Sequence, residues 1–138
     1  MTPRFGQRQL AAAPDVMAPD GSEVRLLVMT VRGSMAHFRV PPGAVSKAVR
    51  HFTVEELWFF VAGRGRMWRR DAEGSEATID VFAGLSIDIP VGTSFQFRAD
   101  SDSVLEAVAV TMPPWPGADE AEFVTGIWEP REAAGGAG

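Results

Sequence analysis

Nine short runs of apolar or alternating polar and apolar residues occupy the middle of the chain, and Gly, Pro and Asp residues separate them. Runs of this length with turn residues between them are typical of the short strands of an antiparallel sandwich or barrel. No segment has a sustained helical period with capping residues; the one short helix that the sequence favours covers 118–123. The runs predicted to be strands are 24–30, 36–40, 45–51, 56–62, 66–70, 77–82, 86–89, 95–99 and 104–111.

The two ends of the chain differ from this middle. Residues 1–22 are rich in Ala, Pro and Asp and predict an extended N-terminal arm, whereas residues 129–138 predict a flexible C-terminal tail. A length of 138 residues suits one domain, and the chain shows neither a repeat nor an internal boundary. We therefore expect a single domain over residues 23–128.

Composition excludes several classes of protein. The chain has no cysteine, which rules out disulfides, zinc sites built on thiolates and a cysteine nucleophile. Its formal net charge of −5 gives no basic surface for nucleic acid. No apolar run reaches the roughly 18–20 residues that cross a membrane, and residues 1–20 lack the apolar stretch of a signal peptide. We expect a cytoplasmic protein that binds neither nucleic acid nor membrane.

Two glycine-bounded motifs follow each other in the chain. In the first, Gly43 precedes Val49-Arg50-His51 by five residues, four residues separate His51 from Glu56, and six more lead to Gly63. In the second, Gly84 precedes Pro90-Val91-Gly92 by five residues, and Phe95 and Ala99 follow at fixed intervals. The order and spacing of both motifs resemble those of the cupin superfamily. The resemblance spans about residues 36–111 and implies an all-β, antiparallel jelly-roll β-barrel.

The same resemblance bears on metal binding. In cupins, two histidines and a glutamate of the first motif and a histidine of the second bind a divalent metal. This chain retains only His51 and Glu56, because Val49 and Phe95, which have no lone pair to donate, hold the other two positions. Catalytic metal sites need about three protein ligands. We therefore expect no cofactor; the alternative is a divalent metal at His51 and Glu56 with a further ligand. The chain's other histidine, His37, is expected to face away from the barrel, because its neighbours in the sequence are better suited to the core.

Strand alternation predicts which side chains line the barrel. Side chains two residues apart share a face of a strand, so His51 and Glu56 bring other residues inward with them. The resulting wall is apolar and aromatic with a few polar groups, which is typical of a small-molecule site. The predicted substrate-binding residues are Lys47, Val49, Trp58, Phe60, Phe95 and Phe97.

The pair of polar residues suggests a function. A desolvated carboxylate at Glu56 would hold protons more tightly, and a protonated His51 would oppose this effect. The two residues can therefore act as catalytic acid and base without metal, in isomerisation, epimerisation, dehydration or cyclisation of a small organic molecule. Two alternatives remain: a cupin that binds or senses a small ligand without chemistry, and a weakly metal-binding cupin.

The edges of a jelly roll need cover, and the N-terminal arm can supply it to a second copy. The resemblance to cupins also implies two-fold pairing, so we expect a homodimer.

Overall fold

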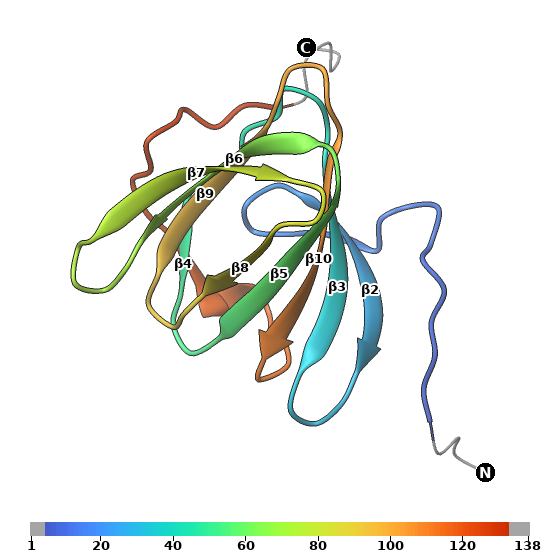
Figure 1. The fold of residues 1–138 in the computed structure, drawn as a ribbon. Coiled ribbons are helices and arrows are strands. Elements are labelled where there is room, and N and C mark those ends of the chain that lie inside the picture. Colours follow the sequence, from blue (N-terminus) through green and yellow to red (C-terminus); the bar gives the residue numbers. More distant parts are fainter. Residues whose placement is uncertain (1–4, 133–138) are drawn as a thin grey trace.

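The computed structural model describes residues 5–132, and almost all of its regular structure is antiparallel β-sheet. Two sheets face each other, one with the strand order β1-β2-β3-β10-β5-β8 and the other with β11-β4-β9-β6-β7 (Figure 1). The expected all-β jelly roll is confirmed. However, in the described part of the chain no strand pairing joins the sheets into a closed barrel. The strands are β1 (Val16–Met17), β2 (Glu23–Met29), β3 (Ser34–Val40), β4 (Val49–His51), β5 (Glu55–Ala62), β6 (Arg64–Arg70), β7 (Glu76–Phe82), β8 (Ser86–Ile89), β9 (Ser94–Ala99), β10 (Leu105–Met112) and β11 (Ala121–Phe123).

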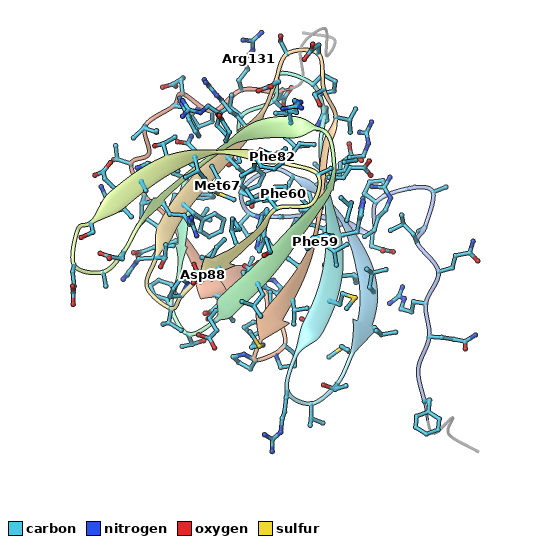
Figure 2. All side chains as sticks on the ribbon, in the orientation of Figure 1. Phe59, Phe60, Met67, Phe82, Asp88 and Arg131 are labelled. Carbon is cyan, nitrogen blue, oxygen red and sulfur yellow. The ribbon has the colours of Figure 1, made fainter. Side chains whose placement is uncertain are left out.

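Strand β5 shows how the sequence pattern builds the interior. Its burial alternates strictly, so that Glu56, Trp58 and Phe60 point between the sheets. The intervening Leu57 and Phe59 point outward and are exposed. Figure 2 shows Phe60 among the side chains between the sheets. The other large, fully buried side chains of the interior include Phe95, Phe97, Met67, Ile89 and Leu105.

Eight of the nine predicted strands agree with the structure to within two residues at each end. The exception is 45–51, of which only Val49–His51 form β4. Ser46 explains the difference. Its N–H donates a 2.9 Å hydrogen bond to the Phe97 carbonyl oxygen, and its hydroxyl accepts a 3.0 Å hydrogen bond from the Phe97 N–H, so Ser46 is not paired in a regular strand ladder. The helix predicted at 118–123 is also shorter than expected: a single 3-10 turn, Ala118–Glu120, leads directly into strand β11.

A motif glycine accounts for the sharp connection between β5 and β6. Gly63 has φ of +82°, and a Cβ atom there would stand 1.9 Å from the carbonyl oxygen of Val104. Both the backbone conformation and the close approach to the β10 end of the sheet require glycine at this position.

The ends of the described chain are tied to the sheets. The arm runs beside β2 (Figure 1), where Arg25 donates hydrogen bonds to the carbonyl oxygens of Ala11 and Ala12, at 2.8 and 2.9 Å. At the other end, Arg131 exchanges two backbone hydrogen bonds with Val45. The flexible tail over 129–138 stays a prediction. Residues 1–4 of the predicted arm and 133–138 of the predicted tail lie outside the described part of the chain. Within 5–132, no helix has the length and apolar character that a membrane crossing demands.

Candidate functional site

A cavity of about 660 Å³ lies against the inner face of β2 and β3 and extends to β4, β5 and β9. Its volume is in the range of sites for small organic molecules. Most of the wall is apolar, and a small number of polar side chains converge on it. The apolar wall includes Val24, Leu26, Ala36, Phe38, Val49, Trp58, Phe95 and Trp115; the polar groups include Asp20, Ser34, His51, Glu56 and Thr111.

His51 and Glu56 form the centre of this polar group. His51 Nδ1 lies 3.0 Å from Glu56 Oε1, and the two residues are only 5% and 3% exposed. The two atoms are at ion-pair distance but are not aligned as a linear hydrogen bond. Because Nδ1 faces the carboxylate, the other ring nitrogen, Nε2, is left for the cavity. A carboxylate beside one nitrogen favours the imidazole tautomer whose opposite nitrogen can accept a proton.

Trp58 fixes the second oxygen of Glu56. Its Nε1–H donates a 2.7 Å hydrogen bond to Glu56 Oε2. The indole is in turn stacked on Phe38, with ring centroids 5.0 Å apart and an interplanar angle of 7°. Both oxygens of Glu56 are therefore engaged by neighbouring side chains, so Glu56 is better placed to orient His51 than to touch a ligand itself.

The imidazole of His51 is held between two aromatic rings. Phe95 meets it edge-on at a centroid distance of 5.2 Å, and Trp115 lies on another side at 4.9 Å. Ser34 fixes the segment of Trp115, since its hydroxyl accepts a 3.0 Å hydrogen bond from the Trp115 N–H. These contacts limit the rotation of the ring and exclude water from its flanks.

Asp20 is a second carboxyl group in the cavity wall, and it was absent from the sequence-based set of site residues. It lies before β2, is 6% exposed, and its Oδ1 accepts hydrogen bonds from the N–H and hydroxyl of Ser22, at 2.9 and 2.6 Å. Burial raises the pKa of the Asp20 carboxyl; the Ser22 hydrogen bonds oppose this, the charge of Glu56 adds to it, and His51 opposes it. The sequence indicates a turn at Ala18-Pro19-Asp20-Gly21, but it gives no indication that the carboxyl group points inward.

The structure divides the predicted site residues into three groups. Val49, Trp58 and Phe95 line the cavity with His51 and Glu56. Their roles in binding and catalysis stay predictions.

Phe60 and Phe97 point into the same interior and contact Trp58, at ring-centroid distances of 6.0 and 5.3 Å. They do not line the cavity and belong to the core. The expected position of Lys47 in the wall is wrong. Its side chain is exposed, with Nζ 5.2 Å from the ring centroid of Phe123. The alternation that would turn Lys47 inward applies only within a regular strand, and β4 begins two residues later.

His37 lies on the face of β3 away from the cavity, where its Nε2 is 3.0 Å from Glu106 Oε1. It therefore supplies no further ligand next to His51. Val49 and Phe95 occupy two of the four cupin ligand positions in the wall, and both oxygens of Glu56 are already engaged. Within residues 5–132, no three His, Cys, Asp or Glu side chains are arranged to hold a metal ion. The donor set of this cavity does not fit a divalent metal.

No protein-family model matches the chain, and no curated protein sequence matches it. Solved structures do match. BH2720 from Bacillus halodurans superposes with a TM-score of 0.62 at 19% identity, over 68% of this chain and 72% of that one. Oxalate decarboxylase from Lactobacillus farciminis, in its formate complex, gives a TM-score of 0.71 at 19% identity, and the Bacillus subtilis enzyme gives 0.72 at 17%. Each covers 90% of this chain, which spans only 38% and 33% of the two decarboxylases. Together with the two spaced motifs and the facing antiparallel sheets, these neighbours show that the chain has the cupin fold.

Proposed function

We propose that this protein binds a small, largely apolar organic molecule between its sheets and acts on it by metal-independent acid–base chemistry. The observation that carries the proposal is the buried pair of His51 and Glu56 in the wall of a cavity of about 660 Å³. A buried imidazole with one nitrogen against a carboxylate and the other toward a cavity suits a general base.

The two residues have different roles in this proposal. His51 accepts the proton at Nε2, and Glu56 holds the ring and stabilises the imidazolium that forms. Trp58 keeps Glu56 in place through its 2.7 Å hydrogen bond. The poor fit of the donor set to a metal supports a reaction without one. The reaction classes that such a base serves are isomerisation, epimerisation, dehydration and cyclisation.

Proton exchange at carbon tests the proposal without knowledge of the natural substrate. Phenylacetone is a suitable probe, because it is small and apolar and has acidic protons next to its carbonyl group. In D₂O, NMR should show that the protein accelerates exchange of these protons and that His51→Gln abolishes the acceleration. Quenching of tryptophan fluorescence should show that both proteins bind the probe, since Trp58 and Trp115 line the cavity.

His37→Gln is the matched control, because it removes a second buried histidine that also pairs with a carboxylate but lies outside the cavity. This variant should retain exchange. Binding of phenylacetone with no exchange by the unmodified protein would instead support the alternative of a binding or sensing cupin. Near-stoichiometric metal in protein purified without chelator would contradict the metal-independent reaction.

We also propose that the chain forms a homodimer through β1–β3 and the arm. Large apolar side chains are exposed there, and a monomer rarely exposes a large continuous apolar surface. Sedimentation equilibrium should give twice the mass of one chain, and a concentration-independent monomer would contradict this. The exposed residues are Phe5, Leu10, Val16, Met17, Leu26, Val28, Met29 and Val31. Of these, Val16, Met17, Leu26, Val28 and Met29 also line the cavity.

A further inference from the structure

Asp20 is a cavity-facing carboxyl group for which the proposed pair of His51 and Glu56 has no use. Its backbone is fixed, since its carbonyl oxygen accepts a 2.8 Å hydrogen bond from the Lys47 N–H, close to the start of β4. Its side chain is fixed too, because both hydrogen bonds from Ser22 go to Oδ1. Oδ2 therefore remains for whatever occupies the cavity.

Burial favours a proton on the Asp20 carboxyl group, and the charged groups around it act in both directions. Glu56 and His51 are the groups whose charges act on it: Glu56 acts to keep it neutral, and His51 acts against this. Arg8 of the arm also lines the cavity, whereas the ammonium group of Lys47 is directed to Phe123. With Asp20 buried to 6% exposure, the neutral form avoids placing a second negative charge beside Glu56.

We propose that Asp20 is a further catalytic residue, the proton donor to the carbonyl oxygen of a ligand whose neighbouring carbon faces His51. This inference rests on the proposed function and names its substrate class: small, largely apolar ketones or aldehydes with a hydrogen on the adjacent carbon. A base and a proton donor on one cavity wall are what proton transfer next to a carbonyl requires.

The step balances without any other reactant. The lone pair of His51 Nε2 takes the proton from the carbon, and the electrons of the broken C–H bond form a carbon–carbon double bond. The electrons of the carbonyl π bond move to oxygen, which takes the proton of Asp20. The products are an enol, an imidazolium beside Glu56 and an aspartate. In the return step the enol oxygen gives its proton back to Asp20 and the imidazolium delivers a proton to carbon. Delivery of a solvent deuteron that has replaced the proton on His51 completes an exchange; delivery to the other face or to another carbon completes an epimerisation or isomerisation.

Asp20→Asn tests this role, since the amide keeps an acceptor for Ser22 but has no acidic proton. With phenylacetone in D₂O, we expect exchange at least about tenfold slower, in line with the effect of losing one acid–base group. The dissociation constant of the probe should change by less than about threefold. Asp15→Asn, which alters an exposed carboxylate of the same arm, should exchange at the unmodified rate.

The pH profile separates a proton donor from a merely structural group. The unmodified protein should lose activity at high pH as Asp20 loses its proton. Asp20→Asn should lack the fall at high pH. As a measurement that needs no variant activity, the ¹³C resonance of the Asp20 carboxyl, assigned by its loss in Asp20→Asn, should show the neutral form where exchange is fastest.

The possible failures are distinct. If Asp20→Asn exchanges at the unmodified rate while His51→Gln is inactive, Asp20 is not the donor, although the proposed function stands. An ionised Asp20 at the pH of fastest exchange overturns the inference in the same way. If the unmodified protein does not exceed the buffer rate, the proposed function and this inference fall together.

Discussion

The sandwich contains two kinds of buried polar group: those whose hydrogen bonds are all made within the protein, and those with an atom left toward the cavity. Gln96 represents the first kind. Its Nε2 donates to the carbonyl oxygens of Ser46 and Trp128, at 2.8 and 2.7 Å, and its Oε1 accepts from the N–H groups of Ile127 and Trp128, both at 3.0 Å. Every hydrogen-bonding position of the amide is used within the protein. Gln96 is fully buried and fastens the segment after β11 to β9, so its role is structural.

Glu120 belongs to the same kind, and Asp20 belongs to the other. The two residues are almost equally exposed, at 7% and 6%, although the Asp20 carboxyl group lies far deeper in the protein than that of Glu120. Burial alone raises the pKa of Glu120, but hydrogen bonds from the Thr53 N–H and hydroxyl and from the Val54 N–H outweigh it and hold this pKa below its usual value. For Asp20 the two bonds from Ser22 do not outweigh burial and the charge of Glu56, so its pKa is raised.

The comparison teaches that low exposure of a residue does not by itself decide the charge of its carboxyl group in this protein. The depth of the carboxyl group, the number of protein donors aimed at it and the sign of the nearby charges decide it together. A carboxylate that receives several donors is a fixed structural anion. A carboxyl group with a free oxygen toward a cavity can hold a proton and share it with a ligand.

The largest expected effect on stability is at Gln96, the group with a structural role. Gln96→Ala leaves four backbone groups without partners and opens a cavity, so the free energy of unfolding should fall by about 3 kcal/mol. Urea denaturation measures this, with Gln9→Ala in the exposed arm as the control. A loss below about 1 kcal/mol would mean that water replaces the amide at little cost. In that case the hydrogen bonds of Gln96 within the protein do not give it a structural role.

A smaller effect is expected at Glu120. Glu120→Gln keeps an oxygen for the Thr53 and Val54 N–H groups but removes the charge, so stability at neutral pH should fall by about 1 kcal/mol. The folded pKa lies below the ordinary 4.5, so the charge stabilises the fold above 4.5. This contribution is lost as pH falls through the lowered value.

Unfolding midpoints of the two proteins should therefore converge in acid. Glu122→Gln, two residues along the chain, is the control, because that carboxylate is about two-fifths exposed and paired with Arg50. If the gap between Glu120→Gln and the unmodified protein is the same at pH 3 and pH 7, the charge of Glu120 is not what stabilises its turn.

The residues of the site that could be predicted from the sequence lie on regular strands. The period of two places Trp58 beside Glu56 on β5, and the motif spacing places Val49 and Phe95 opposite them. The spacing also identifies Gly63 at a turn that no other residue can make. The alternation along a strand and the spacing within a motif are both visible in the sequence alone.

The residues that could not be predicted lie where no period applies. Asp20 and Trp115 are on irregular segments, so nothing in their neighbours fixes the direction of their side chains. The predicted direction of the Lys47 side chain is wrong for the same reason, because Lys47 precedes the first regular residue of β4. The rule of alternation predicts direction only where the backbone is already extended and paired.

The smallest expected change in stability, and the sharpest, is at Asp20. Because its folded pKa is raised above the ordinary 3.8, the folded state favours the proton, and this preference stabilises the fold below 3.8. The contribution is lost as pH rises through the folded value. Asp20→Asn cannot ionise, so it should match the unmodified protein in acid and become the more stable of the two, by no more than about 1 kcal/mol, as pH rises. Unfolding in urea at a series of pH values measures the difference. The change in stability of Asp20→Asn at neutral pH must have the opposite sign to that of Glu120→Gln. Glu120→Gln removes a charge that the folded state stabilises, whereas Asp20→Asn removes a charge that the folded state disfavours. If both variants lose stability together, then the two carboxyl groups are of one kind and Asp20 has no free proton to give.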